Sequence, residues 1–286
     1  YPYYIHGLTT KEEFEEMKAL SAPYFDFEIW DTGVRHSGPK SYANFDYDNL
    51  VKVGDLWEKI SRTSRRVPAT SKSSMGIGFL YDVFVAAGEA CAFQGANWVN
   101  APCYWFPGAL DYQSMTSNGF WGQIHEFNHH FQNYGINPIT EVSNNATSLL
   151  SYVLYTDISS KRSENDSSLT GWNRYTDATR GLRETLQNAG KTQTSLNIYA
   201  DILHTFGVDV FIEATNLQKT RTYTADAWYE ALSKATGYNF TYYFENLIGQ
   251  SLSDDVKTLY NTSDRKIFVP AAMLYQTGRN YYIDGK

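Results

Sequence analysis

The chain has 286 residues, of which 42% are hydrophobic and 19% charged, and its formal net charge is −7 at neutral pH. These values indicate a globular protein with ample core, in one large domain or two small ones. The acidic balance disfavours nucleic acid and anionic membranes as partners, and no run of about 18 apolar residues is present to span a membrane. The chain opens with Tyr1-Pro2 rather than with a methionine or a signal peptide, so we expect a processed form or an excised domain.

The N-terminal segment predicts two helices with an extended segment between them. Thr10 and Glu13 have the spacing of a capping box, which predicts a short helix over residues 10–20. Residues 24–35 are expected to be extended. A second helix is predicted over residues 46–65, because apolar side chains recur there at helical spacing. These side chains are Leu50, Val53, Leu56, Trp57 and Ile60.

From residue 74 the pattern changes to that of strands punctuated by glycine. We predict strands over residues 77–87, 90–93 and 98–104. The two cysteines, Cys91 and Cys103, either form one disulfide across a hairpin or are both small buried hydrophobes. The sequence leaves both alternatives open.

The next stretch contains a His-Glu-x-x-His motif made of His125, Glu126 and His129. Ser117 or Asn118 can cap a helix in front of it. Because residues four apart share a helical face, the two imidazoles are expected one turn apart on the same side. This spacing suits the binding of a zinc ion by two histidines.

The opposite face of this predicted helix is apolar. Large apolar side chains recur there at intervals of four, three and four residues, namely Phe120, Ile124, Phe127 and Phe131. Gly135 can adopt the left-handed conformation that ends a helix. We therefore expect a helix that is anchored by its back, with the histidines facing a cleft.

A catalytic zinc site keeps three protein ligands and one open position, so a third ligand is required. After a turn at residues 137–138, Thr140 has the character of an N-cap, and Glu141 follows it, 12 residues beyond His129. Folding this second helix back would bring the Glu141 carboxylate to the metal. Asn145, four residues further along the same face, could bind the free ring nitrogen of a ligand histidine. The sequence thus predicts one Zn²⁺ per chain; the alternative is an ordinary amphipathic helix with partly exposed histidines.

Residues 125–129 and 140–145 resemble the enhancin-like, mucin-degrading zinc metallopeptidases of the M60 family, whose signature is His-Glu-x-x-His followed by a glutamate that opens a second helix. A second match runs from Phe206-Gly207-Val208 to Leu252-Ser253-Asp254. The resemblance therefore covers residues 45–260, in the same order as in the family.

The resemblance implies an α+β, zincin-like fold with a sheet-bearing N-terminal part, residues 1–110, and a mainly helical catalytic part, residues 111–262, with the active-site helix between them. Both parts would form a single metallopeptidase domain over residues 1–262. Residues 263–286 have a strand-like pattern and are a C-terminal extension or the stub of a following domain. The family also implies an extracellular location, secreted or at the cell surface, and a glycosylated protein such as mucin as substrate.

After Glu141 the chain is predicted to be mainly helical. The predicted helices cover residues 141–158, 177–189, 194–206, 208–217, 225–235, 240–248 and 253–260. In zinc peptidases of this general type, a sheet edge lies upstream of the metal helix and pairs with the substrate backbone. Residues 98–105 are our candidate for this edge, and an interior strand is the alternative.

Glu126 is the predicted general base, because it lies beside the first ligand yet off the ligand axis, where it can accept the proton of a water. Two departures from the family pattern, Asn128 in place of a frequent glycine and the additional His130, remove neither a ligand nor this base. His204 is a candidate oxyanion helper across the cleft, and a core histidine is the plainer alternative.

Four residues are candidates for binding a sugar. Trp121 lies four residues before His125 on the same face, so its indole is expected beside the metal, where it could stack on a glycan. Trp172 could offer a second aromatic face, with Asn173 and Arg174 donating to sugar hydroxyls. An exposed loop anchored by Trp172 is the plainer alternative.

The sequence therefore predicts a zinc-dependent endopeptidase that cleaves glycosylated proteins. The alternatives are a general metallopeptidase without glycan dependence and a catalytically weak glycan-binding or adhesin module on the same scaffold. A binding module has no need of a general base, so the presence of Glu126 together with the three ligand candidates favours the enzyme.

Overall fold

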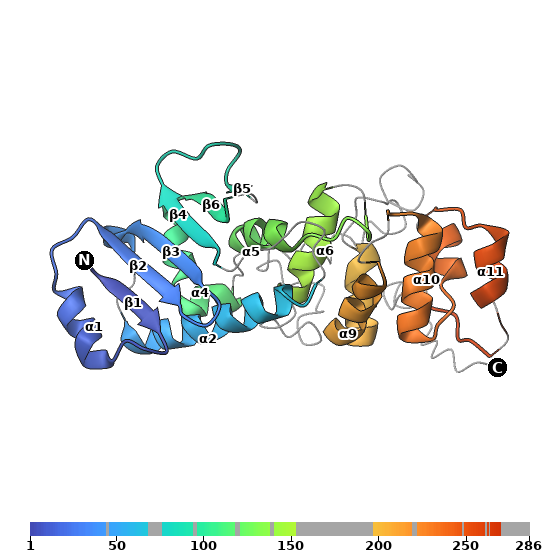
Figure 1. Cartoon of the computed structure of the whole chain (residues 1–286), viewed down its shortest axis with the longest axis horizontal. Coiled ribbons are helices and arrows are strands. Elements are labelled where there is room, and N and C mark those ends of the chain that lie inside the picture. Colours follow the sequence, from blue (N-terminus) through green and yellow to red (C-terminus); the bar gives the residue numbers. More distant parts are fainter. Residues whose placement is uncertain are drawn as a thin grey trace.

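The chain runs along the long axis of the molecule from an N-terminal sheet, through central helices, to a group of C-terminal helices (Figure 1). The computed structural model describes residues 1–43, 46–67, 76–93, 96–117, 121–137, 140–152, 197–218, 222–247, 249–260, 262 and 264–269. This is the predicted α+β fold, with the helix of the His-Glu-x-x-His motif between the sheet-bearing and the helical part.

Six strands form one sheet in the order β1-β2-β3-β4-β6-β5. They are β1 (Tyr3–His6), β2 (Tyr24–Ile29), β3 (Val34–Pro39), β4 (Gly78–Asp82), β5 (Cys91–Phe93) and β6 (Trp98–Pro102). The extended segment predicted over residues 24–35 is the start of the antiparallel β2–β3 hairpin. The short strand β1 was not predicted.

The prediction that residues 98–105 form the sheet edge was wrong, and the interior alternative holds. Strand β6 pairs with β4 on one side and with β5 on the other. The edge strand is therefore β5, which precedes β6 in the sequence. Order along the chain does not give order in the sheet, because β5 adds outside β6 as an antiparallel neighbour. Cys91 and Cys103 are both free thiols.

Two helices pack beside the sheet as predicted. Helix α1 (Lys11–Lys18) begins with the capping box, in which the Thr10 hydroxyl accepts from the Glu13 amide and the Glu13 carboxylate accepts from the Thr10 amide. Helix α2 (Tyr47–Ser64) is capped by Asp46. All five of its predicted apolar residues are buried: Leu50, Val53, Leu56, Trp57 and Ile60.

Three short segments lead from the sheet to the motif, η2 (Cys103–Trp105), α3 (Phe106–Ala109) and α4 (Tyr112–Ser117), and η1 (Lys40–Tyr42) follows β3. The motif lies on α5 (Trp121–Asn128), which continues as a single 3₁₀ turn, η3 (His129–Phe131).

The predicted end of this helix at Gly135 was wrong. Gly135 does not have a positive φ, and the α-helix ends at Asn128. The chain has already left the helix at Gln132, which is extended, with φ of −65° and ψ of 136°. Asn133 holds the turn that follows: its side-chain oxygen accepts from the Gly135 amide at 2.8 Å, and its side-chain nitrogen donates to the Thr215 carbonyl at 3.1 Å.

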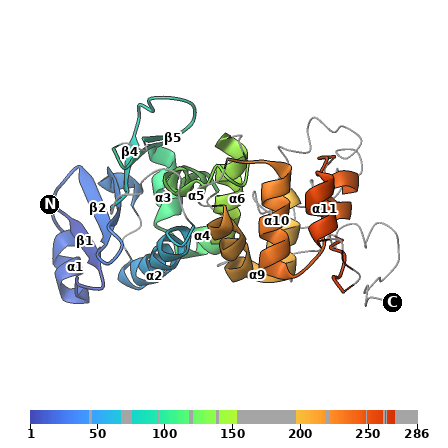
Figure 2. The ribbon, with the colours of Figure 1, turned by 45° about the vertical axis from the view of Figure 1, so that its right-hand side comes forward.

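The C-terminal part is helical, and the predicted elements that lie within the described residues are found. They are α6 (Thr140–Tyr152), α9 (Asn197–Leu217), α10 (Ala225–Thr236), a π-helical turn η4 (Tyr243–Leu247) and α11 (Asp254–Tyr260). Helix α9 is broken at Gly207, with φ of 84°, so it comprises the two helices predicted on either side of this glycine. Figure 2 shows α9, α10 and α11 beyond α6.

Some predictions concern residues outside the described ranges. The helix over residues 177–189 lies there entirely, as do residues 270–286 of the predicted C-terminal extension, the cap candidate Asn118 and the first residue of the apolar stripe, Phe120. From the part of this extension that is described, Ile267 forms a parallel bridge with Asn239. The domain boundary after residue 262 stays a prediction.

The buried hydrophobic residues of the described ranges form two clusters, and α5 contributes to both. Ile124, Phe127 and Phe131 are fully buried in the cluster formed with the sheet and α2, as the apolar stripe predicted. The second cluster joins α6, α9, α10 and α11. Among the described residues, no helix has the length and apolar character needed to cross a membrane.

Candidate metal centre and active site

The two motif histidines approach each other through their Nε2 atoms, which lie 3.2 Å apart. His125 is the fifth residue of α5, and His129 opens the 3₁₀ turn that follows it. The Glu141 carboxylate lies at the same point, with Oε2 3.1 Å from Nε2 of His125 and 3.8 Å from Nε2 of His129. The predicted third ligand is therefore beside both imidazoles.

Helix α6 brings Glu141 there, because two consecutive asparagines dock it on α5. The Asn144 side-chain amide donates to the His125 carbonyl at 2.8 Å. The Asn145 side-chain oxygen lies 2.7 Å from Nδ1 of His125. This contact is the one that the sequence predicted for Asn145, and Glu141 lies in the first turn of the same helix.

The ring of His129 has a similar partner that the sequence analysis did not assign. Its Nδ1 lies 3.1 Å from Oε1 of Gln132, a residue that is fully buried. The signal for this contact in the sequence was the spacing of three residues, which places two side chains on one helical face. The spacing alone does not separate a ring partner from any other polar neighbour.

These contacts make the site suitable for a cation. If both Nδ1 atoms donate to amide oxygens, both Nε2 atoms present bare lone pairs toward the Glu141 carboxylate. Three acceptors then face one another with edges of 3.1, 3.2 and 3.8 Å. Tetrahedral ligands about 2.0–2.1 Å from a zinc ion lie about 3.4 Å apart. His125, His129 and Glu141 therefore fit a divalent metal.

Glu126 also belongs to the cluster, since donor atoms of His125, Glu126 and His129 all lie within 4.8 Å of one another. Its environment differs from that of Glu141. The Glu126 carboxylate is buried and binds the backbone N–H of Ala92 in the edge strand β5. The side chain of Glu141, by contrast, is 63% exposed and free to meet a metal from the solvent side.

The pKa of Glu126 is raised to about 7 in the metal-free chain. Burial is the main cause, the charge of Glu141 adds to it, and the Ala92 amide acts in the opposite direction. A carboxyl with a pKa near neutrality can both accept and return a proton at physiological pH. This property suits a general base better than a permanent metal ligand.

Trp121 is more buried than its predicted sugar-binding role suggests. Its side chain is only 7% exposed and belongs to the C-terminal hydrophobic cluster. Helical spacing gives the direction of a side chain but not what covers it, and here the C-terminal helices do so. The stacking role of Trp121 stays a prediction.

The remaining predicted site residues fall outside the described part of the chain. This holds for Trp172, Asn173 and Arg174 entirely. His204 lies on the described helix α9, but its side chain is outside the description. Their roles stay predictions.

The two departures from the family pattern have structural roles. The Asn128 side-chain amide donates to the Ile124 carbonyl at 2.9 Å, within α5. His130 is buried and has a backbone hydrogen bond with Trp98; burial lowers its pKa to about 4. Both side chains are therefore buried and bind backbone groups inside the protein.

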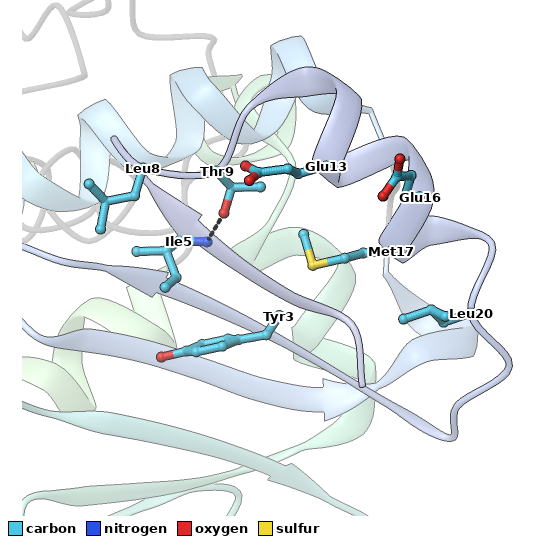
Figure 3. Close-up of a pocket in the computed structure, with 8 residues that line it drawn as sticks. All are labelled: Tyr3, Ile5, Leu8, Thr9, Glu13, Glu16, Met17 and Leu20. Carbon is cyan, nitrogen blue, oxygen red and sulfur yellow. Dashed lines mark hydrogen bonds between the residues drawn. The ribbon is translucent and has the colours of Figure 1, made fainter.

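A separate groove of about 520 Å³ lies between β1 and α1, at the opposite end of the sheet from β5 (Figure 3). Its lining residues are Tyr3, Ile5, Leu8, Thr9, Glu13, Glu16, Met17 and Leu20. Two of its polar side chains are engaged locally: the Thr9 hydroxyl accepts from the Ile5 amide at 2.8 Å, and Glu13 caps α1. We assign this groove no function.

Comparisons with known proteins agree with this geometry. A family model described as peptidase M60, enhancin and enhancin-like, matches residues 1–247. Antigenic protein NP1 of Entamoeba histolytica is 32% identical over 214 residues, which are 72% of this chain and 32% of that protein. The chain thus spans about a third of the length of this relative.

Solved structures show the same fold. A conserved protein of unknown function from Bacillus anthracis superposes with a TM-score of 0.66 at 14% identity, covering 96% of this chain and 58% of that one. The M60 catalytic domain of ZmpC from Clostridium perfringens, solved with the sialyl T antigen, has a TM-score of 0.60 at 18% identity, covering 100% and 60%.

Proposed function

The chain belongs to the M60 family of enhancin and enhancin-like peptidases, and from this premise we propose that it is a zinc-dependent endopeptidase acting on glycosylated proteins such as mucins. The observation that carries the proposal is the convergence of two imidazole Nε2 atoms and one carboxylate oxygen within 3.1–3.8 Å. Three such atoms without a donor between them would repel one another unless a cation lies among them.

In this proposal His125, His129 and Glu141 hold the metal. A zinc ion bound there would supply a Lewis acid that lowers the pKa of a water molecule and polarises the substrate carbonyl. Asn145 would keep the ring of His125 oriented, and Asn144 would keep its backbone in place.

Glu126 is the proposed general base. It accepts the proton of the attacking water and returns it to the nitrogen of the leaving amine, which its raised pKa permits. The Ala92 amide orients the carboxylate, so the base is tied to the edge strand β5. Since an edge strand can pair with an extended peptide, β5 takes the substrate-binding role first expected of residues 98–105.

The glycan dependence has less direct support. It comes from the family and from the C. perfringens domain, which was solved in complex with the sialyl T antigen. An extracellular site of action follows from such a substrate, and we include it in the proposal. The sugar-binding candidates are Trp121, whose indole is buried here, and Trp172, Asn173 and Arg174.

The test is digestion of an O-glycosylated mucin and of its deglycosylated counterpart, each with and without a zinc chelator, followed by mass spectrometry of the fragments. Chelator-sensitive cleavage of the glycosylated form alone would support the whole proposal. Equal cleavage of both forms would leave a general metallopeptidase. Zinc binding without cleavage of either form would favour the glycan-binding module.

The control is a Glu126→Gln protein prepared in parallel. Any contaminating peptidase would cleave equally in both preparations, whereas cleavage by this site requires the Glu126 carboxylate.

A further inference from the structure

We infer that Gln132 is a positioning residue of the metal centre: its carboxamide fixes the tautomer of His129 and joins that histidine to the first turn of α6, which carries Glu141. The inference rests on the proposed function, since it concerns the same metal. It adds a residue that neither the motif nor the predicted ligand set includes.

Hydrogen bonds to α6 determine which end of the Gln132 amide faces His129. Its Nε2 donates to the Thr140 carbonyl, and a carbonyl oxygen can only accept. The same Nε2 lies 2.9 Å from Oγ of Ser143, whose hydroxyl donates to the Thr140 carbonyl at 3.1 Å and therefore must accept from Gln132. The Thr140 carbonyl therefore requires the NH₂ group to point at α6, and the contact with Ser143 agrees with this orientation.

The orientation of the Gln132 amide determines the tautomer of His129. With the NH₂ group directed to α6, the atom facing Nδ1 of His129 at 3.1 Å is the amide oxygen, which can only accept. Nδ1 must therefore carry a proton, and in the neutral ring Nε2 then keeps its lone pair for a metal. The tautomer is set by the chemistry of the Gln132 partners.

Gln132 also links His129 to helix α6. The Tyr134 hydroxyl donates to Oε1 of Gln132 at 3.2 Å, so this oxygen accepts two bonds while the nitrogen donates two. The carboxamide is therefore fully satisfied and fixed in place, in a residue with no exposed surface. His129 and the helix that carries Glu141 are joined through a single side chain.

The chain offers a matched control in Gln123, another buried glutamine close to the motif. Its side-chain nitrogen donates to the Trp105 carbonyl at 3.1 Å, a bond that involves no metal ligand. Gln123→Met removes a buried amide as Gln132→Met does. The two variants therefore separate the loss of a buried hydrogen bond from the loss of His129 orientation.

The experiment measures zinc affinity of the purified chain by competition with a chromophoric chelator. Gln132→Met is expected to weaken zinc binding by about 10–100-fold, the range typical of residues that orient metal ligands. Gln132→Glu keeps an acceptor for Nδ1 of His129 but cannot donate to the Thr140 carbonyl, so it is expected to recover only part of this loss. Gln123→Met is expected to bind zinc as the parental chain does.

A second readout needs neither a variant nor a metal. Nitrogen-15 NMR of the metal-free parental chain is expected to show His129 with its proton on Nδ1 and a bare Nε2. A proton on Nε2 overturns the inference even if Gln132→Met fails to fold. In Gln132→Met, the Nε2-protonated form is expected to appear.

The outcomes separate this inference from the proposed function. If the parental chain binds zinc and cleaves its substrate while Gln132→Met binds zinc equally well, the inference alone is overturned. The same holds if Gln123→Met loses as much affinity as Gln132→Met. A parental chain without zinc affinity overturns the proposed function, and the positioning role of Gln132 falls with it.

Discussion

The two sides of α5 are held by different kinds of interaction. On its back, Phe127 packs against Phe79, Trp57 and Phe131, with ring centroids 5.1–6.4 Å apart and no polar contact required. On its front, the backbone and ring of His125 are bound by asparagines of α6 at 2.8 and 2.7 Å. Packing is tolerant of direction, whereas hydrogen bonds are not. The back therefore fixes where the helix lies, and the front fixes how the imidazoles point.

If this division is right, substitutions on the front of α5 should lower kcat/KM more than the free energy of unfolding. Substitutions on the back should lower the free energy of unfolding more than kcat/KM. The largest expected effect is on the front. Glu126→Gln removes the proton acceptor but keeps the side-chain volume, so kcat/KM for a cleaved glycopeptide is expected to fall by about 10²–10⁴-fold. Zinc content, measured on the same preparation, is expected to stay at that of the parental chain.

The control for this variant is Glu230→Gln on α10, which removes a carboxylate paired with Lys234 at 2.8 Å. It is expected to leave kcat/KM unchanged. If Glu126→Gln retained parental activity with zinc bound, Glu126 would have no part in the mechanism.

The next largest effect is expected on the buried back of α5. Phe127→Ala removes a fully buried ring and leaves a cavity, which is expected to lower the free energy of unfolding by about 3–5 kcal/mol. The measurement is denaturant unfolding, with Leu259→Ala as control because Leu259 is 61% exposed on α11. In the fraction that stays folded, zinc affinity is expected to change less than in Gln132→Met. A larger change would show that the back also orients the ligands.

The same division explains what the sequence could predict of the fold. The capping box at Thr10, the apolar stripe of α2 and the break at Gly207 are local signals, and all three were found. The edge position of β5 depends on its pairing with β6, which no local pattern encodes, and the glycine signal at Gly135 did not mark the end of α5 at Asn128. The predictions of a sheet edge at residues 98–105 and of a helix end at Gly135 therefore failed.

The residues of the site also divide into those that local spacing predicts and those whose role depends on how the helices pack. His125, His129 and Glu141 follow from spacing on two helices, and so does the contact of Asn145 with His125. Trp121 has the right spacing, yet the C-terminal cluster buries it. Gln132 was missed because its significance lies in Thr140 and Ser143, which only the docking of α6 brings to it.

A smaller effect is expected in the pH dependence of stability, which tests the packed core between α5 and the sheet. His36 on β3 is fully buried, stacked on Phe79 at 4.6 Å, and burial lowers its pKa to about 3. In the unfolded chain a histidine has a pKa of about 6.5, so between these values only the unfolded state binds the proton. Stability is therefore complete above about pH 6.5 and falls by about 1.4 kcal/mol per unit as pH is lowered.

The measurement is the free energy of unfolding at pH 6.5 and pH 5, compared with that of His36→Phe. This variant keeps a ring in the stack but cannot titrate. Glu126 and His130 titrate in both proteins, so the difference between the two curves isolates His36. We expect the parental chain to lose about 2 kcal/mol more than the variant over this interval. Parallel curves would contradict the assignment.

The smallest effect lies behind the histidines, where α6 meets α2. The hydroxyls of Ser64 and Ser151 are 3.0 Å apart and buried, and Ser151 also lies 3.4 Å from the side-chain nitrogen of Asn128. Removing either hydroxyl leaves the other without this partner, which is expected to cost about 1 kcal/mol in the free energy of unfolding.

If the hydroxyls of Ser64 and Ser151 share a hydrogen bond, the effects of removing them on the free energy of unfolding should be coupled. Once Ser64→Ala has been made, Ser151→Ala is expected to cost less than it does alone, because the bond is already absent. For a matched pair on the packed side, Leu50→Ala and Phe127→Ala lie in the same core but on different helices, and their effects on unfolding are expected to add. Additive losses at the serines would mean that this hydrogen bond contributes little, and that the contact of α6 with α2, like the back of α5, is held by packing.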